Sequence, residues 1–260
     1  MVEKYIKKFY MTLVYIFLYA PIVFLIIFSF NSEKYSSNWG HFSLKWYSAL
    51  LSDDRILTAL YYTVFVAVIS SIISTVFGTL SAIAIDKMTG LTKKAVLNFN
   101  NIPVLNPDIV TAVSLMTLFI FFKIPFGLTT LIIAHIVFST PYVILSVLPK
   151  LKQLPKDIVK ASLDLGATPS YTMRKIILPQ IKPGIVAGFL FAFTMSIDDF
   201  VISFFNTGND VTNLSIEIYS MARRGISPEI NALSTLMFLT ILILLFLANG
   251  KEFLSKEEKK

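Results

Sequence analysis

Two adjacent carboxylates, Asp198 and Asp199, lie in the apolar segment GFLFAFTMSIDDFVISFF of this 260-residue chain. A third, Asp108, follows Pro107 in another apolar stretch. A carboxylate deep in a membrane costs about 3 kcal/mol even on lenient insertion scales, and such groups mark binding sites or conduction paths. Few Lys or Arg residues lie near them in the sequence, so these acids need a cation from elsewhere. A multivalent amine, with ammonium groups a few methylenes apart, meets that need.

The segment around these acids is expected to be one continuous helix. Asp199 then shares a polar stripe with Ser196, Ser203 and Asn206, because residues three and four apart lie on one helix face. Asp198 points about 100° away from that stripe. A polar stripe of this kind predicts a wet cavity.

Other roles for these residues stay open. One or more of the aspartates can cap a helix end or pair with another helix. An aspartyl protease dyad is disfavoured, because Asp198 and Asp199 do not face each other across two helices and no Gly-x-Gly-Asp motif occurs. His135 lies near Ser139 in an apolar stretch, where an interhelical hydrogen bond is favoured over a proton relay.

The composition indicates a membrane protein. The chain is 55% hydrophobic and only 15% charged, with mean hydropathy +0.71, whereas ordinary globular chains carry about 25% charged residues. Lipid must solvate much of it. The chain has no cysteine, which excludes disulfides and thiolate metal sites, and no metal site is expected.

About six spans of roughly 20 apolar residues predict an all-α, polytopic membrane bundle. The first is expected to be an uncleaved spanning helix, since it is longer than a signal-peptide core. With a cytoplasmic N-terminus, 17 of the 23 Lys and Arg residues fall in cytoplasmic segments, which places both termini inside. The net charge of +7 is therefore assigned to membrane topology and not to nucleic-acid binding. The spans are 9–30, 57–85, 104–122, 128–148, 183–205 and 231–248.

The third span is interrupted by polar residues and prolines that a continuous lipid-facing helix would not tolerate. Broken helices occur where they line a cavity or are buried in protein. This span is therefore a first indication of a transport path. The interrupting residues are Asn98, Asn100, Asn101, Pro103, Asn106 and Pro107.

The basic segment 149–182 has the pattern of two short helices joined by a sharp turn. Gly166 suits the left-handed position that ends the first helix. Thr168 then caps the second, with Pro169 at its first position, and Leu178-Pro179 is expected to end it. An amphipathic hairpin lying on the membrane is the alternative interpretation.

The spacing of Gly166, nine residues and then Ile176-x-Leu178-Pro179 resembles the EAA loop of ABC importer permeases. The resemblance implies a coupling helix that docks in a groove of an ATPase subunit. That family begins the motif with Glu-Ala-Ala, where this chain has Lys160-Ala161-Ser162. No Gly-x4-Gly-Lys-Ser/Thr phosphate loop is present. The chain is therefore not expected to be an enzyme, and ATP and Mg²⁺ are expected on a partner.

Two longer stretches, DLGATPSYTMRKIILPQIKPGIVAGFLFAFTMSIDDFVIS and IEIYSMARRGISPEINALSTL, resemble the spermidine/putrescine ABC permeases of the PotC type. The resemblance implies a MetI-like, type I importer permease of one transmembrane domain, residues 1–260, in the bacterial inner membrane. It also implies three kinds of partner: a PotB-type permease, two PotA-type ATPases and an extracytoplasmic PotD-type binding protein.

The same resemblance implies polyamine contacts at five positions. Trp46, in an outer loop, can hold an ammonium group over its indole, although a tryptophan of the interfacial belt is equally compatible with the sequence. The expected function is ATP-driven import of spermidine or putrescine. Import of another small cation or a cationic peptide is the first alternative, and a stand-alone proton-coupled carrier is the second. The five positions are Trp46, Asp108, Ser196, Asp198 and Asp199.

Overall fold

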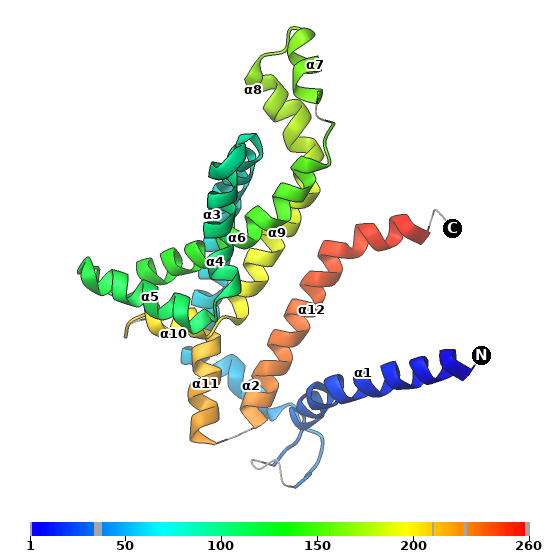
Figure 1. Ribbon diagram of the computed structural model, residues 1–260. Coiled ribbons are helices and arrows are strands. Elements are labelled where there is room, and N and C mark those ends of the chain that lie inside the picture. Colours follow the sequence, from blue (N-terminus) through cyan, green and yellow to red (C-terminus); the bar gives the residue numbers. More distant parts are fainter. Residues whose placement is uncertain (1, 34–37, 156, 210, 226–227, 258–260) are drawn as a thin grey trace. The chain divides into compact units, whose positions relative to one another are not determined.

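The computed structural model describes residues 2–33, 38–155, 157–209, 211–225 and 228–257, with side chains from residue 5 to residue 243 within these ranges. The described ranges are almost entirely helical (Figure 1), which confirms the predicted all-α class. The elements are α1 (Val2–Phe28), α2 (Lys45–Ser52), α3 (Asp54–Lys87), α4 (Gly90–Leu105), α5 (Asp108–Phe121), α6 (Leu128–Lys152), α7 (Ile158–Asp164), α8 (Pro169–Tyr171), the π-helical turn η1 (Thr172–Ile177), α9 (Leu178–Asp198), α10 (Val201–Asn206), α11 (Leu214–Arg224) and α12 (Pro228–Glu257).

The chain divides into two compact units. One combines residues 1–58 with 217–260, and the other comprises residues 59–216. The second unit contains most of α3, all of α4 to α10, and the three acidic residues identified above.

Four helices in the described ranges are long and apolar enough to cross a membrane, and α4 and α5 form a fifth, bent pair. The pair bends by 106° at Asn106 and Pro107, so the predicted interruption of the third span is confirmed. The expected continuous helix over 183–205 is wrong. Its helix, α9, ends at Asp198, and a separate short helix, α10, follows.

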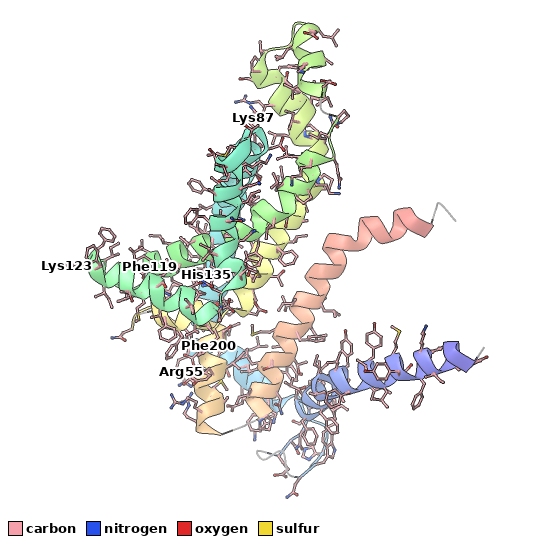
Figure 2. All side chains as sticks on the ribbon, viewed as in Figure 1. Arg55, Lys87, Phe119, Lys123, His135 and Phe200 are labelled. Carbon is pink, nitrogen blue, oxygen red and sulfur yellow. The ribbon has the colours of Figure 1, made fainter. Side chains whose placement is uncertain are left out.

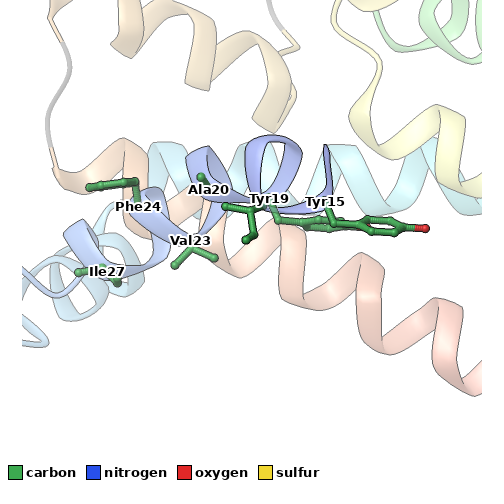
Figure 3. A pocket seen from close by; sticks show the side chains of 7 residues that line it. Tyr15, Tyr19, Ala20, Val23, Phe24 and Ile27 are labelled. Carbon is green, nitrogen blue, oxygen red and sulfur yellow. The ribbon is translucent and has the colours of Figure 1, made fainter. Parts of the chain in front are cut away.

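Helix α1 presents apolar side chains on all sides of its spanning part. None of the residues in its most hydrophobic window is buried within the chain. Figure 3 shows one such face, where side chains from Tyr15 to Ile27 form an apolar surface. A helix that is apolar all round and unburied is suited to contact with lipid.

Helices α3, α6 and α9 pack closely around Val143 of α6. A Cβ added at Gly78 of α3 would lie 2.6 Å from the Val143 Cβ, and one at Gly188 of α9 would lie 3.2 Å from its Cα. Gly184 and Gly188 form a Gly-x-x-x-Gly pair against α6, which runs beside α9 in Figure 1. Small residues let membrane helices approach closely and gain dispersion contacts.

We therefore expect Gly78→Ala to destabilise the α3–α6 contact by about 1–3 kcal/mol, because the added methyl forces the two helices apart. The thermal unfolding of the purified protein in detergent measures this effect. Gly127→Ala is a matched control, since a Cβ at Gly127 meets no atom within 4 Å. Equal unfolding temperatures for the two variants would contradict the packing argument.

The segment between α6 and α9 follows the predicted helix–glycine–helix pattern. Gly166 has φ +83°, and the amides of Gly166 and Ala167 donate to the carbonyls of Leu163 and Ser162, at 2.9 and 3.1 Å. This is the Schellman arrangement that ends a helix. The hydroxyl of Thr168 accepts a hydrogen bond from the amide of Tyr171 at 3.2 Å, as expected of a helix cap.

One prediction for this segment is wrong. The second short helix does not end at Leu178-Pro179. Helix α8 continues through the π-helical turn η1 into α9, so that Pro169–Asp198 is one helical run of 30 residues. Pro179 lies two residues after the π-helical turn η1, and local π adjustments allow a membrane helix to accommodate the missing amide hydrogen of a proline.

Candidate functional site

The acidic pair lies at a break between two helices. Helix α9 ends at Asp198, Asp199 is extended with ψ 122°, and α10 begins at Val201. The Asp199 carboxylate accepts hydrogen bonds from the amides of Ile202 and Ser203, at 3.1 and 2.7 Å, and from the Ser203 hydroxyl at 3.0 Å. It thereby pairs amide groups at the start of α10 that would otherwise have no acceptor.

The three acids differ sharply in exposure. Asp199 is only 9% exposed, whereas Asp198 and Asp108 are exposed. Of the three, only Asp199 is therefore buried within the chain. The open alternative, that an aspartate caps a helix, holds for Asp199. Asp198 is the carboxylate of the pair that a ligand can reach.

Asp108 and the acidic pair lie on helices that pack together. Asp108 is the first residue of α5, directly after the bend, and α5 packs against α10, which starts directly after the acidic pair. In the part of the chain that the structure describes, no lysine or arginine forms an ion pair with any of them. The site thus offers two accessible carboxylates and a strongly negative environment, which is suited to a diffusible cation.

The residues of the predicted polar stripe come together by a different geometry. Ser196 on α9 and Ser203 on α10 both bond to the fully buried His135 of α6. Asn206 donates to the carbonyls of Ile202 and, across to α5, Ala112. The prediction of a hydrogen-bonded interhelical histidine is confirmed. Ser196 is only 2% exposed, so it belongs to the packed interior of the unit.

Two further members of this polar network were not predicted. Asn213 donates to the Ser203 hydroxyl at 2.7 Å, and Ser70 of α3 lies 3.3 Å from the Ser196 hydroxyl. Asn213 precedes α11 and accepts from the amide of Ile216 at 3.0 Å, which is the N-cap pattern. Hydroxyl groups recurring along an apolar span, as in α3, indicate contacts between membrane helices. The cap residue Asn213 and the recurring hydroxyl residues of α3 are both visible in the sequence.

Trp46 lies in the other unit, so the described geometry does not connect it with the acids. Its indole nitrogen donates to the carbonyl of Asn31 at 2.7 Å, and the ring is buried. The ammonium group of Lys45 stands over this ring, 4.8 Å from its centroid. The ring therefore already engages a cation, and that cation belongs to the chain itself.

The predicted coupling residues lie together on α7 and the turn that follows it. Lys160 and Ala161 are exposed, and the Lys160 ammonium lies 3.5 Å from Asp157 in a weak surface ion pair. Ser162 is buried and its hydroxyl bonds to that of Thr172 at 2.7 Å. A shallow concave surface lies beside this contact. It is lined by Ser162, Leu165, Gly166, Ala167, Thr168, Tyr171 and Ile176.

Comparison with known proteins decides the family. The model of the binding-protein-dependent transport system inner membrane components matches residues 74–250. The chain belongs to this family. The resemblance to PotC-type permeases is likewise confirmed, since this permease is 38% identical to the spermidine/putrescine transport system permease protein PotC of Escherichia coli K12. That match covers 94% of this chain and 92% of PotC.

Two further relatives and one solved structure are also similar to this permease. PotC of Haemophilus influenzae is 37% identical to the permease, with 94% and 95% of the two chains covered. The putrescine transport system permease protein PotI of Escherichia coli K12 is 36% identical, with 89% and 85% covered. A solved bacterial ABC transporter for the acidic polysaccharide alginate superposes with a TM-score of 0.69 at 15% identity, covering 100% of this chain and 99% of the other. The permease therefore has the fold of ABC importer permeases.

Proposed function

We propose that this permease is a membrane-spanning subunit of an ATP-driven importer of polyamines such as spermidine and putrescine. The observation that carries the proposal is the pair of exposed carboxylates, Asp108 and Asp198, with the buried Asp199, none of which pairs with a lysine or arginine in the described chain. A linear polyamine brings several ammonium groups that such spaced carboxylates can hold in turn. The names of the relatives PotC and PotI support this substrate class.

The energy for transport would come from partner subunits. We propose a PotB-type permease that completes the path, two PotA-type ATPases that bind ATP and Mg²⁺, and a PotD-type binding protein outside. The concave surface between α7 and α8 would receive the ATPase, and Leu165 at its edge is 88% exposed. Such exposure of a leucine suits a protein interface. The excess of Lys and Arg in 149–182 and at both termini supports a cytoplasmic side for all three.

Substrate would pass the acids by transient binding. Asp108 and Asp198 would hold ammonium groups well enough to load them and weakly enough to release them. Asp199 would act mainly by holding the start of α10. Rocking of the spans between outward and inward access would follow ATP binding on the partner.

Uptake of radiolabelled spermidine tests the function, in cells that lack their own polyamine importers and carry this permease with its partner subunits. We expect saturable uptake that unlabelled spermidine and putrescine inhibit and that an ATPase-inactive partner abolishes. Inhibition only by unrelated cations or cationic peptides would point to another substrate. Uptake that survives loss of the ATPase and collapses with the proton gradient would favour a proton-coupled carrier.

Trp46 leads to a prediction about substrate affinity. If its ring also takes an ammonium group of the substrate, Lys45 competes for the ring face. Lys45→Gln should then lower the KM for spermidine about two- to fivefold, the range for a cation–π contact whose ammonium group is exposed. Initial uptake rates over a range of spermidine concentrations measure this. Lys45→Arg, which keeps a cation over the ring, is the matched control, and an equal change in both variants would argue against competition.

A further inference from the structure

One side chain of α6, His135, bridges the helix break beside the acids. This histidine lies in the interior of the 59–216 unit (Figure 2) and is fully buried. Its Nδ1 lies 2.7 Å from the hydroxyl of Ser196, which precedes the break, and its Nε2 lies 3.0 Å from that of Ser203, which follows it. One imidazole from α6 therefore spans the two helices that meet at Asp199.

The neighbouring hydrogen bonds fix the direction of this bridge. The Ser203 hydroxyl donates to Asp199 and accepts from Asn213 at 2.7 Å, so it can only accept from the histidine. His135 then carries its proton on Nε2, and its Nδ1 accepts from Ser196, because a neutral imidazole has one donor and one acceptor. The Ser203 hydroxyl connects the histidine directly to the carboxylate that caps α10.

The geometry points to His135 as a positioning residue for the amine path. By fixing the angle between α9 and α10, it keeps Asp199 turned inward as a cap and Asp198 exposed. The same geometry assigns Ser196 a role through His135, since a side chain that is 2% exposed and bonded to the imidazole is not placed to contact substrate. The positioning role follows from the hydrogen bonds alone. Only its expected effect on substrate binding rests on the proposed function.

Thiol labelling tests the positioning role without reference to any substrate. The chain has no cysteine, so a single Asp198→Cys or Ile197→Cys replacement reports the accessibility of one position. Asp198 is exposed and Ile197 is buried, so a small cationic thiol reagent should label position 198 about tenfold faster or more, as protection of buried groups leads us to expect. The labelling is read on this chain, in the complex with its partner subunits.

We expect His135→Leu, which removes both hydrogen bonds, to reduce this difference in labelling several-fold. The glutamine in His135→Gln can still donate to Ser203, so this variant should preserve most of the difference in labelling rate between positions 198 and 197. Ser139→Ala is the matched control, because the Ser139 hydroxyl is buried one turn further along α6 and has no hydrogen-bond partner among the described residues. If His135→Leu does not reach the membrane, Ser203→Ala and His135→Asn, which each break the Ser203 side of the bridge, take its place.

Transport kinetics provide the second measurement. His135→Leu should raise the KM for spermidine about tenfold, in the range of one or two lost buried hydrogen bonds, whereas His135→Gln should restore most of the affinity. An unchanged labelling difference in His135→Leu, at the wild-type protein level, would overturn the positioning role. Absence of spermidine uptake by the unmodified permease would instead overturn the proposed function and leave the labelling test intact.

Discussion

Asp198→Asn should raise the KM for spermidine uptake about 10- to 100-fold, while the amount of permease in the membrane stays unchanged. The substitution removes one exposed negative charge and leaves the hydrogen bonds by which Asp199 caps α10 in place. A hydrogen bond between charged groups contributes about 1.5–3 kcal/mol, and each 1.4 kcal/mol corresponds to a factor of ten in affinity. Uptake rates over a range of spermidine concentrations, with immunoblots of the membrane fraction, measure the effect.

The neighbouring substitution separates charge from structure. In Asp199→Asn, an NH2 group replaces one of the two oxygens that accept the backbone amides of Ile202 and Ser203 in the native protein, whichever way the side chain turns. Two donors then face each other at the start of α10, so this variant should lose protein or maximal rate more than affinity. Asp54→Asn, the same change at an exposed helix start in the other unit, is the control. A normal KM for Asp198→Asn with a raised KM for Asp199→Asn would reverse the assignment.

Five of the six predicted spans correspond to helices, or to the bent pair, that are long and apolar enough to cross a membrane, but the sequence did not predict the break beside the acids. Helices α9 and α10 are both apolar, and no glycine or proline stands between them, so only Asp198 and Asp199 interrupt the hydrophobic pattern at the junction. The local signal was Asp199 itself. An aspartate whose side chain accepts a hydrogen bond from the backbone amide three residues later follows the pattern of a helix N-cap. Such a cap provides acceptors for backbone N–H groups at the start of the helix. Each of these groups would cost several kcal/mol of free energy if it were left without a hydrogen bond in lipid.

The predicted polar stripe illustrates the same limit. Spacings of three and four correctly selected Ser196, Asp199 and Ser203 as neighbours, although they meet through His135 and a cap and not along one helix. Periodicity can group residues of one segment. It cannot show which distant helix supplies the partner, because that depends on how α6 packs against α9. The glycines that allow this close packing are visible in the sequence only as a Gly-x-x-x-Gly pair.

The continuous helix that connects the coupling segment with the acids is also visible only in the structure. The sequence indicated an end at Leu178-Pro179, whereas α8, η1 and α9 form one run from Pro169 to Asp198. At 1.5 Å per residue, 30 residues span about 45 Å. In Figure 1, α7 and α8 lie at one end of α9 and α10 at the other. A tilt of the coupling segment would therefore be carried by a continuous helix to the break that exposes Asp198.

Gly166→Pro should abolish uptake and weaken binding of the ATPase subunit about tenfold or more, without removing the permease from the membrane. Proline fixes φ near −65° and has no amide hydrogen. Gly166 has φ +83° and donates to the carbonyl of Leu163 at 2.9 Å. The substitution thus removes both features of the turn that sets the angle between α7 and α8. Co-purification of the ATPase with tagged permease, together with spermidine uptake, measures the loss.

Two further variants show whether the backbone of this turn, and not a side chain, sets the binding surface. Gly166→Asn should retain most binding, because asparagine tolerates the left-handed conformation and a Cβ at Gly166 meets no atom within 4 Å. Gly90→Ala imposes a similar strain outside the coupling segment, since Gly90 has φ +64° and is equally free of contacts. It should leave ATPase binding unchanged. Loss of ATPase binding in Gly90→Ala, or full ATPase binding in Gly166→Pro, would show that the turn at Gly166 does not determine docking of the ATPase. Retained binding with lost uptake would instead place the defect in the transmission of movement along α9.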